Sequence, residues 1–357
     1  MAAKEKNKTS ISAIVRSQYF IPILAIVVLL IFDLISNPAF FLIDFKGQTL
    51  SGNLITVFSH GAQYVILTVG MTFVTAASGG QDISVGAIMT IAAGVIFRFI
   101  LSVSDGTDVS MGYILLAFLL AILVAMLCGA FNGILVSIFK IQPMVATLVL
   151  YTAGRQIAQM INNGSNIGIQ DKTFKYFGQN IPNCPIPTPI IVTVVFLILI
   201  ALLMKFTTIG LNIQSVGINE NAAKLNGMNP VFIKFITFVI LGACSAIAAI
   251  LYVTQTGTLS YSACGKDYEM DTILAVALGG NALSGGKFSI GAAVLGAYAY
   301  QLLLTSLNGW SFVESDGFKA YKAIIVIVLV VCSSTTVREK FGKLVKKIKK
   351  SGKMEVA

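Results

Sequence analysis

The glycine-rich segment 279–288 is the part of this sequence that comes closest to a nucleotide-binding motif. Its Gly286 and Lys287 match the end of a phosphate-binding loop. That loop also requires a glycine six residues before the lysine and a serine or threonine directly after it. The sequence has Asn281 and Phe288 at these two positions, so we expect a tight turn between helices instead. If ATP drives this protein, another chain must hydrolyse it.

Other catalytic or metal-binding groups are scarce. His60 is the single histidine of the chain, which excludes a histidine-based metal site. The five cysteines contain no CxxC pair, and no GxSxG motif is present. Cys184 and Cys264 fall in segments that we assign to outer loops, where they either pair or stay free, and we favour free thiols. We therefore predict a protein that is not an enzyme and binds no metal and no cofactor of its own.

Five polar side chains interrupt otherwise apolar stretches: His60, Gln63, Arg155, Gln159 and Gln301. A polar group inside a membrane is costly unless it faces water, a solute or a hydrogen-bonding partner. We take these residues as candidates for the wall of a solute pathway. The alternative is that they hydrogen-bond one another between helices, which we prefer for Arg155. We assign all fifteen Asp and Glu residues to loops, tails or helix ends, and so expect no buried carboxylate relay of an ion-coupled carrier.

The composition places these residues in a membrane. Hydrophobic residues make up 56% of the chain and charged residues 11%, and apolar runs long enough to cross a bilayer recur along it. We predict an all-α, polytopic membrane protein with about ten transmembrane helices, some of them broken. The eighth candidate span is too short to cross alone, so it must tilt, break or extend into 262–270. The candidate spans are 19–36, 53–77, 83–104, 112–139, 143–163, 190–208, 230–253, 271–279, 288–307 and 319–335.

The excess of basic residues lies mainly at the two ends of the chain. The formal net charge is +10, and many of the lysines fall in a tail over 1–18 and a tail over 336–357. By the positive-inside rule both tails are cytoplasmic, which requires an even number of crossings. This placement argues against nucleic-acid binding and for contact with the bilayer. We expect one domain over 1–357, with a helix bundle over 19–335 between the tails.

The polar stretch 214–230, which we place on the cytoplasmic side, predicts a short, well-capped helix. Asn219 is placed to cap its start, and Glu220 suits the positive end of the helix dipole. Gly227 is placed for a left-handed stop. The small side chains of Ala222 and Ala223 would let this helix sit closely in a cleft of another protein. So short a helix usually needs a surface to dock on; the alternative is a capped surface helix without a partner.

Two glycine pairs predict turns between helices. Gly79–Gly80 precedes Asp82, which we expect to cap the following helix through the amides near Ser84. A contact of Asp82 with a solute or with an ATPase is the alternative. Gly285–Gly286 supplies the second turn, within the glycine-rich segment described above.

Four segments in order carry a resemblance over about residues 50–335. They are Ser78-Gly-Gly-Gln-Asp-Ile-Ser-Val-Gly86, Asn132-Gly133 followed by 140–148, the small-residue pattern of 217–227, and the glycines of 278–286. Together they resemble the permease subunit of bacterial ABC sugar importers of the ribose, xylose and galactofuranose type. Two positions depart from the family pattern: Gln81 replaces the usual aliphatic residue, and Phe288 stands where glycine is frequent.

The resemblance implies a multi-pass permease of the bacterial inner membrane that forms the pathway for a monosaccharide, a pentose or a hexose. It implies a homodimer, or a heterodimer with a sister permease. It further implies an extracytoplasmic sugar-binding protein and a cytoplasmic ATPase subunit that uses ATP and magnesium and docks on 214–230. The alternatives are an importer of this type for a nucleoside, an autoinducer-like sugar or a branched-chain amino acid, and an ion-coupled secondary carrier.

Overall fold

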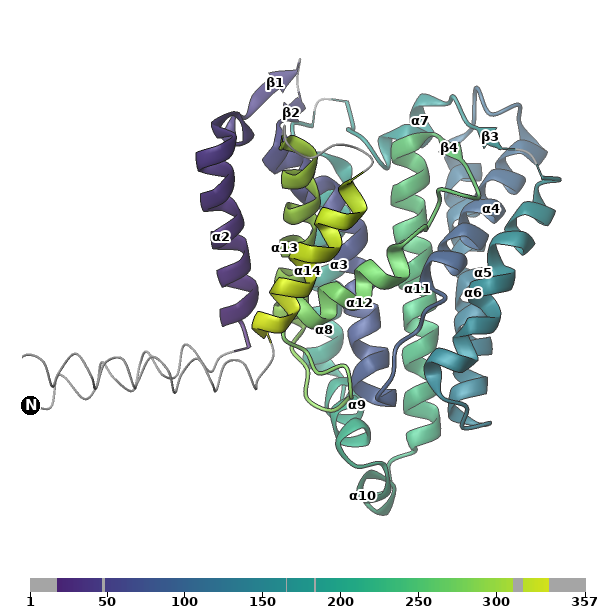
Figure 1. The fold of residues 1–357 in the computed structure, drawn as a ribbon. Coiled ribbons are helices and arrows are strands. Elements are labelled where there is room, and N and C mark those ends of the chain that lie inside the picture. The colour runs from purple at the N-terminus through teal and green to yellow at the C-terminus, as the bar shows by residue number, and fades with distance from the viewer. Residues whose placement is uncertain (1–17, 47–48, 165, 183, 311–316, 334–357) are drawn as a thin grey trace, which may run out of the picture.

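The computed structural model describes residues 18–46, 49–164, 166–182, 184–310 and 317–333, which form a mostly helical bundle (Figure 1). Two short antiparallel sheets, β1 with β2 and β3 with β4, lie at one end of it. The long helices are α2 (Phe20–Ser36), α3 (Asn53–Ser78), α4 (Val85–Val103), α5 (Met111–Ser137), α6 (Pro143–Ile161), α8 (Thr188–Phe206), α11 (Pro230–Thr256), α13 (Ile290–Gly309) and α14 (Phe318–Ser333). The shorter elements are η1 (Pro38–Phe41), α7 (Lys172–Tyr176), α9 (Ile209–Ile218), α10 (Glu220–Leu225), α12 (Tyr268–Leu278), β1 (Asp44–Lys46), β2 (Thr49–Ser51), β3 (Ile167–Gly168) and β4 (Thr258–Leu259).

Six of the described helices are long and apolar enough to cross a membrane: α3, α4, α5, α8, α11 and α13. The eighth predicted span falls on α12, whose 11 residues reach only about 16 Å at 1.5 Å per residue. This helix lies among the others at mid-height (Figure 1). The total of about ten crossings and the cytoplasmic placement of the termini stay predictions. Both predicted tails fall almost entirely outside the described residues.

The centre of the bundle is formed by α3 and α11, which pack against one another and against α4, α5 and α13. Nearly every residue of α3 from Gly61 to Ala77 is buried. Glycines let α5 and α11 approach backbone to backbone: a Cβ on Gly129 would lie 2.3 Å from the carbonyl oxygen of Phe238, and one on Gly242 would lie 2.3 Å from that of Ala125. Small residues at such crossings are typical of helices that pack within membranes.

The outer helices α5 and α8 present Leu, Ile and Val side chains outward, among them Leu119, Leu127, Val195 and Leu199. In water so large an apolar surface would be unfavourable, whereas lipid accepts it at no cost. The arrangement therefore agrees with a multi-pass membrane protein.

The four cysteines whose side chains are described are free thiols, including Cys184 and Cys264. Cys264 is fully buried beside α4, where its carbonyl oxygen accepts a hydrogen bond from the Thr90 hydroxyl at 2.9 Å. The Cys264 side chain is therefore out of reach of solvent.

The buried carboxylates lie in turns or near helix ends, as predicted, although their burial was not foreseen. Five are buried in the described structure: Asp33, Asp82, Asp171, Glu269 and Asp271. Each has hydrogen-bonding partners, as a buried charge requires. Asp33 on α2, for example, accepts from the Ser306 hydroxyl at 2.6 Å and from the Trp310 indole at 2.9 Å. These partners are distant in the sequence, and a reading of local hydropathy does not bring them together.

Candidate functional site

The four motif segments, scattered over more than 200 residues, come together in the fold. Gly79 ends α3 in the left-handed conformation, with φ of +67°. Three residues later, Asp82 Oδ1 accepts from the Ser84 amide at 2.7 Å and from its hydroxyl at 2.6 Å. The Asn132 side-chain amide on α5 donates to Asp82 Oδ2 at 3.2 Å. Asp82 is thus fully enclosed, and its contacts are those of a local turn and an interhelical bond.

Two further hydrogen bonds fix the same turn to its neighbours. The Ile83 amide donates to the Thr147 hydroxyl on α6 at 3.1 Å. The Gln81 side chain donates to the Leu283 carbonyl oxygen at 2.9 Å. Gln81, the departure from the family pattern, therefore joins the first motif segment to the fourth.

The polar stretch 214–230 packs against the other motif segments through Gly217. The Gly286 amide donates to the Ala76 carbonyl oxygen near the end of α3 at 3.0 Å. Gly217 of α9 lies against both: a Cβ there would lie 1.8 Å from that oxygen and 2.7 Å from the Gly286 nitrogen. Glycine is required at Gly217 because no side chain fits, and α9 consequently lies directly on the end of α3.

The predicted short helix in this stretch is α10. Asn219 caps it by accepting from the Ala222 amide at 3.0 Å. Gly227 follows with φ of +78°, the left-handed stop expected of a helix end. A 2.6 Å ion pair joins Glu220 to Lys234 on α11, so Glu220 ties α10 to its own chain.

The outward surface of α10 differs in part from the sequence interpretation. Ala223 is buried in the bundle's own apolar core, so it is not available to another protein. Ala222 and Gly227 are exposed. The Leu225 side chain is 89% exposed and Ile218 is 62% exposed. Figure 1 shows α10 projecting beyond the rest of the bundle, which leaves these apolar side chains without cover from the described part of this chain.

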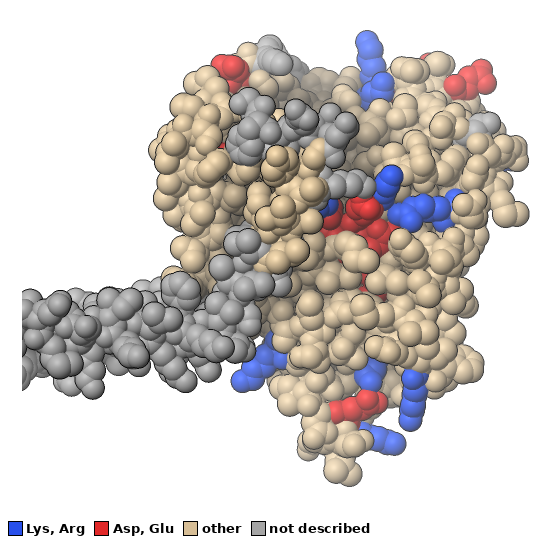
Figure 2. Space-filling view, in the orientation of Figure 1, with Lys and Arg blue, Asp and Glu red and all other residues tan. Residues whose placement is uncertain are grey.

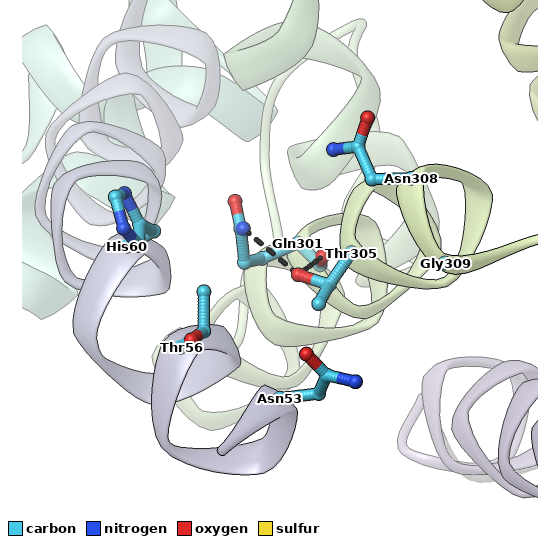
Figure 3. A pocket seen from close by; sticks show the side chains of 7 residues that line it. All are labelled: Asn53, Thr56, His60, Gln301, Thr305, Asn308 and Gly309. Carbon is cyan, nitrogen blue, oxygen red and sulfur yellow. Dashed lines mark hydrogen bonds between the residues drawn. The ribbon is translucent and has the colours of Figure 1, made fainter. Parts of the chain in front are cut away.

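A polar cavity of about 300 Å³ lies between the first turns of α3 and the last turns of α13 (Figure 3). His60 and Gln301, two of the five candidate pathway residues, approach it from opposite sides. Gln301 donates to the Thr305 hydroxyl at 3.2 Å. The full lining is Asn53, Thr56, His60, Gln301, Thr305, Asn308 and Gly309. No side chain in this lining carries a formal charge when the imidazole is neutral.

A second cavity, of about 370 Å³, shares Thr56 and His60 with the first and extends to Gln179 and Gln255. Gln63, another candidate, lies one helical turn beyond His60, and its side chain bonds to Gln255 and Tyr268. Its amide donates to the Gln255 side-chain oxygen at 2.8 Å, and it accepts from the Tyr268 hydroxyl on α12. Gln63 therefore connects the cavity region to α12.

The remaining candidates lie elsewhere. Arg155 on α6 forms a 2.9 Å ion pair with Glu269 on α12 and donates to the Gly265 carbonyl oxygen at 3.0 Å. On the other side of α12, Asp271 pairs with Lys322 of α14 at 2.6 Å. Gln159 lies one turn beyond Arg155 and lines neither cavity. Of the five candidates, His60 and Gln301 line a cavity, Gln63 connects it to α12, Arg155 belongs to an ion pair at α12, and Gln159 joins none of these groups.

Several cavity residues were missed, although their spacing was visible. Asn53, Thr56 and His60 recur at i, i+3 and i+7, and Gln301, Thr305 and Asn308 recur at i, i+4 and i+7. Each set defines one face of a helix. The carboxylates of α12 gave no comparable signal, because their basic partners lie more than 50 residues away.

The arrangement agrees with the outcome of comparisons with known proteins. A family described as branched-chain amino acid transport system, permease component, matches residues 53–334. The chain belongs to this family. The matched range of this permease begins at the first residue of α3 and ends just after α14. It contains all four motif segments and the full lining of the cavity between α3 and α13.

Relatives of the permease include sugar transporters. It is 34% identical to the galactofuranose transporter permease protein YtfT of Escherichia coli, over 93% of each chain. It is 31% identical to the fructose import permease protein FruF of Bifidobacterium longum, over 92% of this chain and 91% of the relative. The ribose import permease protein RbsC of Escherichia coli is 30% identical over 86% and 91%. No solved structure matches the permease.

Proposed function

We propose that this chain is the transmembrane subunit of an ATP-driven, binding-protein-dependent importer in the bacterial inner membrane, and that it forms the pathway of a monosaccharide. The neutral, amide- and hydroxyl-lined cavity between α3 and α13 is the observation that carries the choice of solute. Sugar hydroxyls both donate and accept hydrogen bonds, as the Asn, Gln, Thr and His side chains of this lining do. Relatives named for galactofuranose, fructose and ribose support the same choice.

A branched-chain amino acid, which the family description names, fits this cavity less well. Its ammonium and carboxylate groups would need charged or strongly polar partners when removed from water. Both described cavities are lined without a lysine, arginine, aspartate or glutamate. The ion pairs of α12 are already satisfied within the chain.

The energy would come from a separate ATPase subunit that docks on α10. Leu225 and Ile218 supply exposed apolar side chains for this contact, and Asn219, Ala222 and Gly227 shape the helix that presents them. ATP and magnesium would bind the ATPase and not this chain. An extracytoplasmic binding protein would deliver the sugar to the opposite end, and a second permease subunit would complete the pathway.

The helix α3 offers a direct link between these two ends. Its Ala76 lies against Gly217 and Gly286 beside α10, and its His60 lines the cavity. The two residues are sixteen positions apart, which corresponds to about 24 Å of helix. Because α3 is buried along this length, a displacement of α9 would move α3 as a rigid body.

Reconstitution of the permease with its ATPase and binding protein in proteoliposomes tests the proposal. We expect uptake of a labelled pentose or hexose that requires enclosed ATP and the binding protein, and no uptake of leucine. Uptake driven by a proton or sodium gradient without ATPase would instead identify a secondary carrier. Uptake of leucine alone would reject the assignment of the solute.

A further inference from the structure

Helix α2 stands at the edge of the bundle (Figure 1) and packs on α13 along one narrow face. Its exposed side chains between Ile23 and Ile35 are apolar, and Figure 2 shows uncharged residues over most of this helix. Asp33 is the single charged residue of α2 and is fully buried. It lies one turn beyond Leu29 on the buried face, where an apolar side chain would continue the packing. A charge inside a membrane is costly unless protein or water compensates it.

The Asp33 carboxylate meets two donors at the end of α13. Oδ2 accepts from the Ser306 hydroxyl at 2.6 Å, and Oδ1 accepts from the Trp310 indole at 2.9 Å. Just beyond α2, the Asn37 side-chain amide donates to the Gly309 carbonyl oxygen at 3.4 Å. These partners belong to the last turn of α13 or directly follow it. Apolar packing has no preferred direction, whereas hydrogen bonds do, so these contacts fix the orientation of the turn as well as its burial.

The opposite side of the same turn lines the neutral cavity. Thr305, Asn308 and Gly309 belong to the lining, and so does Gln301 one turn earlier. Gln301 donates to the Thr305 hydroxyl beside the cavity at 3.2 Å (Figure 3). Thr305 and Ser306 are neighbours in the sequence, and one faces the cavity while the other bonds to α2. A shift of the last turn of α13 would therefore displace several polar groups of the cavity wall together.

We infer that Asp33 is a positioning residue of the sugar cavity. Through its two bonds to α13 it holds the last turn, so that Thr305 and Asn308 meet the sugar already oriented. A preorganised wall binds more tightly because less conformational freedom is lost on binding. The inference rests on the proposed function, which assigns the sugar to this cavity. Helix α2 lies outside residues 53–334, which the family model matches, so the positioning group comes from beyond the matched range.

Sugar uptake by the reconstituted importer tests the inference. Asp33→Leu keeps α2 apolar, with a side chain of similar size, and removes both bonds. We expect the KM of uptake to rise about tenfold, which corresponds to about one lost hydrogen bond. The maximal rate should change by less than about twofold, because a wall that orients the sugar contributes to binding and not to turnover.

Two further variants serve as controls. Asp33→Asn retains an oxygen for the Trp310 indole and supplies an amide to the Ser306 oxygen, while the Ser306 hydroxyl donates to the Leu302 carbonyl oxygen at 2.8 Å. Its KM should stay within about twofold of the parent value. Val28→Ala replaces an exposed side chain of the same helix and should leave both KM and the maximal rate unchanged.

Trp310→Phe provides a milder test should Asp33→Leu fail to insert. It keeps an aromatic ring beside Phe32, whose ring centroid lies 4.6 Å from that of Trp310, and it removes one bond to Asp33. We expect KM to rise about threefold, and the combination with Asp33→Leu to add nothing further, because both changes remove the same bond. An unchanged KM in both single variants, a fall in the maximal rate alone, or additive increases in KM would overturn the inference.

Fluorescence examines the same turn without transport. Trp310 is the only tryptophan of the chain, so its emission from the purified permease reports on the end of α13. Acrylamide should quench it at least about twofold more strongly in Asp33→Leu than in the parent protein or Asp33→Asn, because the turn opens locally when it is no longer held. Equal quenching in the three proteins would overturn the inference.

The two measurements separate this inference from the proposed function. If the parent protein imports sugar and Asp33→Leu leaves KM unchanged, the inference about Asp33 alone fails. If no ATP-dependent sugar uptake occurs in the parent protein, the proposed function fails, and the quenching of Trp310 still decides whether Asp33 holds the turn.

Discussion

Replacement of Leu225 by alanine should weaken binding of the ATPase without destabilising the permease. Leu225 is the most exposed of the large apolar side chains in the described structure, at 89%, so within this chain it contributes little to packing. If the ATPase covers it, Leu225→Ala removes about 2 kcal/mol of apolar burial, at about 0.8 kcal/mol per methylene-sized group. At 1.4 kcal/mol per tenfold change in affinity, Kd should rise about 30-fold.

The fold of α10 should survive this change. Alanine has the highest helix propensity, and the Asn219 cap and the Glu220–Lys234 ion pair are untouched. Thermal unfolding of the purified variant should therefore match that of the parent protein, within the roughly 0.5 kcal/mol typical of surface substitutions.

Surface plasmon resonance between permease in nanodiscs and its ATPase measures the effect. Leu199→Ala on α8, also exposed, is the matched control and should leave Kd unchanged. A rise in Kd of less than about threefold for Leu225→Ala, or an equal rise for Leu199→Ala, would refute docking on α10. A loss of about 2 kcal/mol of binding free energy must raise Kd by more than that.

Three further changes test the cavity, the ion pair and the coupling contact. Gln301→Leu removes an amide from the cavity lining and should raise the KM of sugar uptake about tenfold through one lost hydrogen bond, with the amount of permease in the membrane unchanged. Arg155→Leu leaves Glu269 buried without its partner and should lower stability by about 3–5 kcal/mol, whereas Arg155→Leu combined with Glu269→Leu should recover most of it, both measured by thermal unfolding in detergent. Gly217→Val must separate α9 from Ala76, since a Cβ on residue 217 would lie 1.8 Å from the Ala76 carbonyl oxygen. We expect the variant to insert into the membrane and its ATPase to hydrolyse ATP, whereas sugar uptake is lost.

Each of these has an outcome that contradicts it. An unchanged KM for Gln301→Leu would place the sugar elsewhere. A double variant at Arg155 and Glu269 as unstable as the single one would mean that the pair is not the source of the loss. Normal uptake by Gly217→Val would show that the contact between α9 and α3 carries no motion.

Local features of the fold were predictable because their causes are local. The cap at Asn219, the left-handed glycine at Gly227 and the turn at Asp82 depend on residues within a few positions of one another. The same holds for most long apolar helices. The short α12 was anticipated as a span too short to cross alone, and its start at Tyr268 falls within the extension over 262–270 that the sequence allowed.

Features that depend on distant partners were missed. Glu269 and Asp271 lie near a helix start, as predicted. Their burial and ion pairs were not foreseen, because only the folded bundle brings Arg155 and Lys322 to them. Ala223 was expected to face another protein, and it packs instead into a core formed by Phe288 and residues of four other helices. Hydropathy along one segment contains no information about which face meets which neighbour.

The bond between Asp33 and Ser306 has a consequence for how this protein is made. The two residues are 273 positions apart, and at roughly 5–20 residues per second the ribosome needs roughly 14–55 s to travel from one to the other. Throughout that interval α2 carries a carboxylate whose hydroxyl and indole partners do not yet exist. Although α2 is synthesised long before α13, it therefore reaches its final position only after α13 has been made.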